Sequence, residues 1–128
     1  MSRRFTPLAV IASLALLGAC GGGSGTPAST VSIPTDALLV KAVASIRFDA
    51  KEYGPVPAGE VTIGYVNEDT VRHTLILAKD GTKVPNFKLN IAKKGSSDVG
   101  SVTLEAGTYS LLCDVPGHQN MKATLVVK

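Results

Sequence analysis

Aromatic side chains are scarce in this chain of 128 residues, which has no tryptophan, three tyrosines and three phenylalanines. A hydrophobic core must therefore be built mainly from aliphatic side chains. Motifs of enzyme chemistry are also missing. There is no Ser, His and Asp arrangement suited to nucleophilic catalysis and no paired carboxylates at a candidate pocket, and the glycines at 21–25 precede no predicted helix. These absences disfavour a hydrolase or a nucleotide-binding enzyme.

A strong charge of one sign is missing as well. Residues 20–128 contain eleven basic and ten acidic side chains, and only Lys93 and Lys94 form an adjacent basic pair. Nucleic-acid-binding domains need a basic patch that neutralises phosphates. The composition therefore predicts no nucleic-acid partner.

The first twenty residues have the organisation of an export signal. Arg3 and Arg4 precede the apolar run 8–19, which is too short to cross a bilayer comfortably. The run ends at Leu-Gly-Ala-Cys, which resembles the lipobox of bacterial lipoproteins. This resemblance implies that residues 1–19 are a lipoprotein signal peptide and that Cys20 carries lipid, with acyl chains that together anchor the protein firmly. An ordinary secretory signal with a chance cysteine is the alternative.

Gly, Ser, Thr and Pro dominate the next segment, 21–35, which has no apolar period. Such a composition is typical of a flexible linker. We therefore interpret residues 20–35 as the lipidated cysteine and a tether, although a generic spacer has the same composition. The folded domain then spans residues 36–128 and is held outside the cytoplasm on a bacterial membrane, in the periplasm or at the cell surface.

Apolar and polar residues alternate along this domain, and no stretch of the length of an ordinary helix has a helical period. Clusters rich in Gly and Pro at 53–60, 79–86 and 93–98 separate the alternating runs. Short strands at this spacing predict an all-β sandwich or barrel. The expected strands lie in 38–50, 60–67, 73–78, 99–107, 108–113 and 121–128.

Cys113 is the only thiol left if Cys20 carries lipid. A lone cysteine outside the cytoplasm is inertly buried, bonded to another chain, or used in a site. His118 and Met121 follow it closely, and the other histidine, His73, begins a predicted strand. Each of these residues, taken alone, also suits a packed core position.

One thiolate, two imidazoles and a thioether are the ligand types of a blue copper centre. Cu(I) prefers soft sulfur and low coordination, whereas Cu(II) prefers nitrogen and a more planar array. A Cys and two His in a plane, with a weak axial Met, suit both oxidation states, so an electron can arrive or leave with little rearrangement. Zinc also accepts Cys and two His but seldom takes a thioether.

Residues 36–128 resemble the cupredoxins, the small type I copper proteins such as plastocyanin, azurin, amicyanin and halocyanin. The resemblance lies in Cys-x4-His-x2-Met at Cys113, His118 and Met121, and in His73, which lies 40 residues upstream of the cysteine. It implies a Greek-key β-sandwich of seven to eight strands that binds one copper ion through these four residues.

The resemblance also implies roles for neighbouring groups. The main-chain amides of Thr74 and Val115 would point at the sulfur of Cys113 and tune the reduction potential. The edge of His118 would reach the surface within an apolar rim, contributed by residues 115–117, where a redox partner docks. We interpret Asp114 as a solvated loop charge.

We therefore predict a monomeric electron carrier between membrane-associated partners, such as a cytochrome or a copper oxidoreductase. A carrier makes and breaks no bond, so the chain is predicted not to be an enzyme. Two alternatives stay open: an extracytoplasmic protein that binds and delivers copper, and a cupredoxin fold used only as a structural module. A delivery protein needs an open, exchangeable site, often rich in Met or His, whereas only one methionine follows Cys20.

Overall fold

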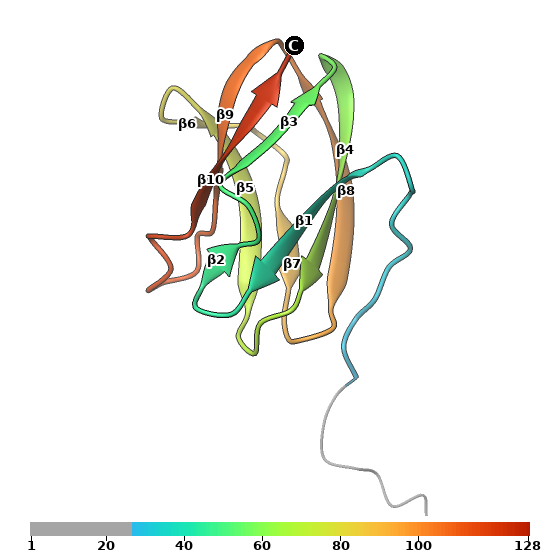
Figure 1. Ribbon diagram of the computed structural model, residues 1–128, viewed down its shortest axis with the longest axis vertical. Coiled ribbons are helices and arrows are strands. Elements are labelled where there is room, and N and C mark those ends of the chain that lie inside the picture. The colour runs from blue at the N-terminus through green and yellow to red at the C-terminus, as the bar shows by residue number, and fades with distance from the viewer. Residues whose placement is uncertain (1–26) are drawn as a thin grey trace, which may run out of the picture.

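Two β-sheets packed face to face form the described part of the chain, residues 27–128 of the computed structural model (Figure 1). One sheet has the strand order β2-β1-β4-β8, and the other has the order β3-β10-β9-β5-β6, with β7 paired to β5. The strands are β1 (Leu38–Val43), β2 (Arg47–Phe48), β3 (Glu52–Val56), β4 (Gly59–Asn67), β5 (His73–Lys79), β6 (Thr82–Lys83), β7 (Leu89–Ile91), β8 (Ser97–Leu104), β9 (Gly107–Leu112) and β10 (Lys122–Val127).

The predicted all-β sandwich is confirmed. Ten strands, several of them only two or three residues long, take the place of the seven to eight that we expected. Within residues 27–128 there is no helix with the length and hydropathy needed to cross a bilayer.

The core is formed by side chains at every second position of several strands. Strand β4 buries Val61, Ile63 and Tyr65, as the alternation predicts, and β10 buries its residues at 123, 125 and 127. These side chains join one continuous cluster between the sheets. In β5 every residue from His73 to Ala78 is buried, and the strand pairs with β6, β7 and β9.

The sequence analysis missed strand β3, which lies in a segment that we had interpreted as a turn. Gly54 and Pro55 are unfavourable inside a central strand, and they misled the prediction. Strand β3 pairs only with β10, so it lies at the edge of the larger sheet. A proline, which has no amide N–H, is tolerated in an edge strand because one side of that strand has no neighbour to bond. Strands β6 and β7 are too short to show a period.

The described end of the predicted tether lies against the sandwich. The hydroxyl of Ser97 accepts a hydrogen bond from the Val31 amide at 2.9 Å and donates one to the Val31 carbonyl at 3.2 Å. The Ser97 amide donates to the carbonyl of Ser29, and Ile33 covers Gly64, where an added Cβ would clash with the Ile33 side chain. Residues 29–33 thus differ from a freely moving linker, whereas Cys20 and the predicted signal peptide 1–19 lie outside the described residues.

We predict that Ser97→Ala loosens residues 29–33 without unfolding the domain. The substitution removes both hydroxyl bonds to Val31, each worth about 0.5–1.5 kcal/mol. Hydrogen exchange of the Val31 amide should become faster, while the amides of β4 and β9 keep their protection. Ser101→Ala, on the same strand but bonded to Thr62, is the matched control and should leave Val31 unchanged. Equal exchange at Val31 in wild type and Ser97→Ala would contradict the anchoring.

Candidate metal centre

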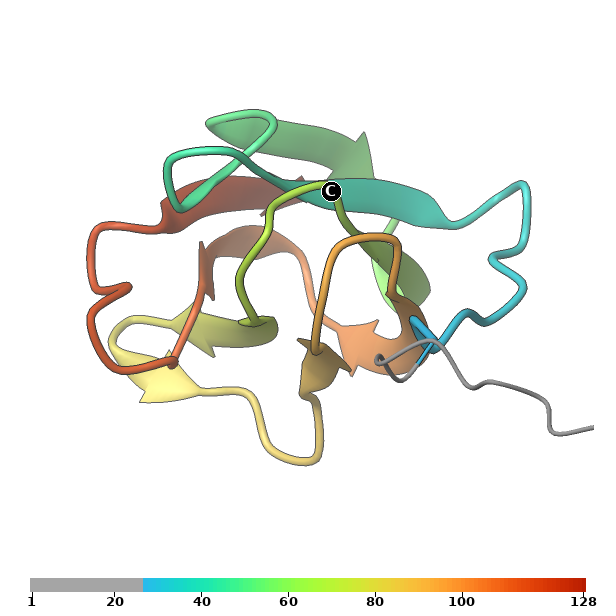
Figure 2. The ribbon, with the colours of Figure 1, turned by 90° about the horizontal axis from the view of Figure 1, so that it is seen from below.

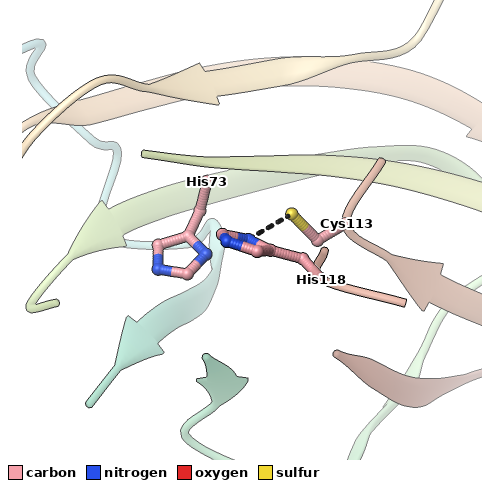
Figure 3. A group of neighbouring side chains, drawn as sticks. All are labelled: His73, Cys113 and His118. Atoms are coloured by element: carbon pink, nitrogen blue, oxygen red, sulfur yellow. Dashed lines mark hydrogen bonds between the residues drawn. The ribbon is translucent and has the colours of Figure 1, made fainter. Parts of the chain in front are cut away.

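Three side chains with metal-binding atoms meet where β5 begins (Figure 3). His73 is the first residue of β5, Cys113 directly follows β9, and His118 lies in the loop that leads to β10. One ligand atom from each residue lies within 4.8 Å of the other two, and all three residues are buried. The antiparallel register of β5 and β9, with Ile76 opposite Leu112, carries Cys113 to the start of β5.

The loop between β9 and β10 is shaped by a tight turn at residues 115–118. The His118 amide donates a hydrogen bond to the Val115 carbonyl at 3.0 Å, and Gly117 has φ +89°. Pro followed by Gly at the two central positions is the signature of a type II turn, which needs a positive φ at the glycine. The turn brings His118 back towards Cys113, so that Nδ1 of His118 lies 3.5 Å from the Cys113 sulfur.

One ring nitrogen of His73 has a hydrogen-bond partner and the other has none. Its Nε2 lies 3.0 Å from a carboxylate oxygen of Asp69. Its Nδ1 is the only buried side-chain nitrogen or oxygen without a hydrogen-bond partner among residues 27–128. An unpaired buried polar atom is costly and calls for an explanation. A metal ion beside Nδ1 would supply the missing partner, and a carboxylate on the other nitrogen is the usual support of a metal-binding histidine.

The protonation states of this pair suit metal binding. Burial raises the pKa of Asp69, but hydrogen bonds from the Thr70 amide and the His73 ring outweigh it, so the pKa lies below its usual value. Burial lowers the pKa of His73; the Asp69 bond opposes this, and the nearby His118 adds to it. An ionised Asp69 can only accept, so neutral His73 carries its proton on Nε2 and directs the lone pair of Nδ1 into the site.

The sulfur of Cys113 receives a main-chain donor, as we expected from the resemblance. The Thr74 amide donates to it at 3.5 Å, and the Thr74 hydroxyl lies 3.6 Å away. This hydroxyl, and not the expected amide of Val115, provides the second contact. Asp114 is more than a solvated charge, because it accepts hydrogen bonds from the Thr74 hydroxyl and from Lys88 Nζ. Lys88 and Thr74 thereby lower the pKa of Asp114.

Asn67 and Asp69 are supporting residues that the sequence analysis did not find. Asn67 is buried at the end of β4, donates to the carbonyl of Val71 at 2.8 Å and accepts from the Asp69 amide at 2.9 Å. This closes the loop before β5 and sets Asp69 beside His73. The only available signal was the position of Asp69 four residues before His73 in a polar loop, which is common without any site.

The four predicted site residues are all buried. His73 is fully buried, Met121 is 1% exposed, and Cys113 and His118 are 7% and 8% exposed. Met121 belongs to the same loop, since its amide donates to the His118 carbonyl and its carbonyl accepts from the Cys113 amide. The structure therefore groups His73, Cys113 and His118. Met121 is buried at the end of the loop that carries Cys113 and His118.

Comparison with known structures identifies the fold. No protein-family model matches this chain, and no curated protein matches it in sequence. Reduced auracyanin from the photosynthetic bacterium Roseiflexus castenholzii aligns with a TM-score of 0.61 at 19% identity, over 73% of this chain and 98% of auracyanin. A reduced amicyanin variant aligns with a TM-score of 0.58 at 23% identity, over 80% of this chain and 92% of amicyanin.

Auracyanin A from the green thermophilic photosynthetic bacterium Chloroflexus aurantiacus, described as a "blue" copper protein, is also similar. It aligns with a TM-score of 0.56 at 27% identity, over 72% of this chain and 98% of auracyanin A. These likenesses define the class of structure: the chain has the β-sandwich fold of the cupredoxins.

We predict that Asp69→Ala destabilises the metal-free protein by about 1–3 kcal/mol, because Nε2 of the buried His73 loses its partner. Urea unfolding of the metal-free protein measures this loss. The matched control is Glu68→Ala at the neighbouring position, where the carboxylate pairs with Lys41 at the surface and contributes about 0–1 kcal/mol. Equal losses in the two variants would show that the Asp69–His73 bond has no special weight.

Proposed function

We propose that this chain is a mononuclear type I copper protein that carries single electrons between membrane-associated redox partners. The observation that carries the proposal is the buried meeting of Cys113, His118 and His73, with a partnerless Nδ1 on His73. One thiolate sulfur and two imidazole nitrogens form the donor set of blue copper sites. The structural likeness to auracyanin A, a "blue" copper protein, supports the same function.

His73, Cys113 and His118 are the proposed ligands, and Met121 is the proposed weak fourth ligand. Bound copper would supply a one-electron Cu(I)/Cu(II) couple. The contribution of the chain itself is to hold the ligands in place before the metal arrives. Asp69 fixes the ring of His73, the Thr74 amide donates to the sulfur, and the turn at 115–118 positions His118. A site held in this way suits both oxidation states, because a scaffold of paired strands resists rearrangement.

Burial favours an electron carrier over a copper-delivery protein. None of the four proposed ligand residues is more than 8% exposed, whereas metal transfer requires ligands that an acceptor protein can reach. His118 lies in the loop between β9 and β10, between the exposed positions 116–117 and 119–120, so it is the proposed exit for the electron. The proposed activity changes only the charge of the metal, so the protein acts without chemical turnover of a substrate and is not an enzyme.

We also propose that the protein works outside the cytoplasm as a monomer attached to a bacterial membrane. The support is the sequence of residues 1–35, with a signal peptide over 1–19, a lipidated Cys20 and a tether that leads to the domain at 36–128. A membrane-bound carrier would meet a cytochrome or a copper oxidoreductase by diffusion along the surface.

We predict that the purified protein becomes intensely coloured when it receives Cu(II), through charge transfer from the Cys113 sulfur. Visible absorption and electron paramagnetic resonance check this, and the resonance spectrum should show a narrow copper hyperfine splitting. Cys113→Ser should fold normally and stay colourless, because a hydroxyl replaces the thiolate. A wild-type protein that binds one copper ion without the visible band would contradict the proposal.

A second prediction separates the roles of the two histidines. His118→Gly should bind copper weakly and regain the visible band on addition of imidazole, because the removed ring leaves a gap in a loop whose positions 116–117 and 119–120 are exposed. His73→Gly is the matched control and should not regain it, since His73 is fully buried in the sandwich. If imidazole restored both variants equally, or neither, the assignment of His118 as the accessible edge would be wrong.

A further inference from the structure

The N-terminal segment joins the sandwich at the end that carries the candidate metal centre. Residues 29–31 are bonded to Ser97 at the start of β8. Ala28 lies beside Gly95, where an added Cβ would be 3.6 Å from the Ala28 Cβ. Gly95 belongs to the connection from β7 to β8, and its amide donates to the carbonyl of Asn67 at the end of β4. The chain therefore enters the domain beside the connection from β4 to β5, which leads to the candidate site.

The length of chain before Ala28 limits which end of the domain can touch a membrane. Ala28 lies eight residues after Cys20, and eight residues of fully extended chain span at most about 28 Å. Strand β4, which separates the two ends of the sandwich, has nine residues and is about 30 Å long. If lipid holds Cys20, the opposite end could therefore touch the bilayer only when this chain is almost fully stretched. The metal-bearing end can touch it without stretching.

Asn67 connects the loops at this end into one surface. Its side chain donates to the carbonyl of Val71 at 2.8 Å, and its main chain is bonded to residues 95 and 96. In the same loop, Asp69 accepts a hydrogen bond from the main chain of Ile46, in the turn between β1 and β2. Figure 1 shows the three connections in teal, yellow-green and orange at the bottom of the molecule. We call them the end surface, which consists of residues 44–46, 68–72 and 92–96.

Apolar and basic side chains are exposed together on the end surface. Ile46 is 36% exposed and Val71 is 41% exposed, and they are two of the four large hydrophobic residues exposed in residues 27–128. A third, Val31, lies in the adjoining N-terminal segment. Arg72 and Lys94 are also exposed. Apolar side chains that enter the head-group region, with cations that attract anionic lipids, are the chemistry of binding to a membrane surface.

Ile46 has an unfavourable backbone conformation as well. Ser45 and Ile46 occupy the centre of the turn between β1 and β2, with φ of +73° and +54°. Such positions are normally occupied by Asn, Asp or Gly, and a β-branched residue with a positive φ is a rare outlier. A contact of this side chain with something outside the domain would explain why the chain has isoleucine at the turn.

The carboxylates near the end surface are engaged within the domain. Glu68 pairs with Lys41 at 2.8 Å, and Asp69 is buried. Asp98, further along β8, accepts hydrogen bonds from two main-chain amides. The end surface itself contains three basic and two acidic side chains. Because Lys41 offsets Glu68 and Asp69 lies inside, the charge that this end presents to the outside is positive.

We propose that the end surface rests on the lipid bilayer, with Ile46 and Val71 among the head groups and Lys94 against anionic lipids. This deepens the proposed function and rests on the membrane attachment proposed there. In Figure 1 the orange-red loop 113–121 lies at the side of the molecule, above the end surface. Figure 2, seen from below, shows this loop on the side opposite the blue N-terminal segment. A domain seated in this way presents His118 along the membrane plane, where a membrane-bound redox partner can approach.

The contact is tested without copper and without relying on lipidation in the cell. Cys113→Ser leaves Cys20 as the only thiol of the full chain, and a maleimide phospholipid couples to it in bicelles of equal parts phosphatidylcholine and phosphatidylglycerol. A second lipid carries chelated gadolinium, which broadens the nuclear magnetic resonance signals of nearby amides. The amides of the end surface should be broadened most. Those of the turns at the opposite end should be broadened least, namely residues 57–58, 80–81 and 105–106.

Two pairs of variants separate the apolar and the charged contributions. Val71→Ser should weaken the broadening of the end surface by about fivefold, because an apolar contact with lipid is lost. Its matched control is Leu39→Ser, since Leu39 is 44% exposed but lies within β1, away from the end surface.

Lys94→Gln should also weaken the broadening by about fivefold, the effect of one basic side chain near an anionic membrane, and should have no effect in bicelles of phosphatidylcholine alone. Its control is Lys128→Gln, because Lys128 is exposed and its carbonyl accepts from the Ala58 amide at the opposite end. Ile46→Asn should keep the fold, since asparagine tolerates a positive φ, and should weaken the broadening as Val71→Ser does.

Several results would overturn the proposal. Equal broadening of the two ends would show that the domain has no preferred face towards the bilayer, and the exposed apolar residues would then be left to a protein partner. Equal effects of Val71→Ser and Leu39→Ser would exclude a contact through the end surface. Mass spectrometry of the chain isolated from bacteria tests the lipid on Cys20 separately, and the visible band tests copper. Either can fail while the bicelle result stands, because the coupling is chemical and the protein is free of metal.

Discussion

Antiparallel pairing between β5 and β9 is the constraint on which the candidate centre depends. The register places Ile76 opposite Leu112 and so brings Cys113 to the beginning of β5, beside Thr74. A shift of one residue would turn the Cys113 side chain to the other face of the sheet, because strand side chains alternate. The sulfur would then lose both the Thr74 contacts and its closeness to His118. The site is therefore a consequence of strand register, which is enforced in β9 by the alternation of buried Tyr109 and Leu111 with exposed Thr108 and Ser110.

The second requirement is that a polar ring be buried in an aliphatic sandwich at little cost. His73 has no exposed surface, and Asp69 satisfies one of its nitrogens. Asp69 is positioned by Asn67, which closes the loop between β4 and β5 through its own side-chain bonds. The same arrangement leaves Nδ1 without a partner in the folded chain. One residue therefore links stability to ligand binding, because a ligand in the site would supply the partner that Nδ1 of His73 lacks.

The sequence predicted the fold class, the main strands and the grouping of His73, Cys113 and His118. These features are carried by period-two alternation and by scarce residue types at short spacing, both of which are local signals. It did not predict β3, because Gly54 and Pro55 are read as a turn unless the strand is known to lie at an edge. Nor did it predict Asp69 or the roles of Asn67 and Asp114. Asp114 has its partners on distant segments, at Thr74 and Lys88, and the bonds of Asn67 and Asp69 depend on how the loop between β4 and β5 folds. The sequence shows no local sign of either kind of contact.

The charge of residues 72–94, with six basic side chains and one acidic side chain, shows that a sum over the chain conceals where its charges lie. The overall balance of eleven basic and ten acidic side chains in residues 20–128 gave no reason to expect a basic segment. A separation of charge along the molecule orients an approaching partner even when the net charge is close to zero, because the partner responds to the nearest charges. Orientation without tight binding is what a carrier requires, since each partner must leave before the next can dock.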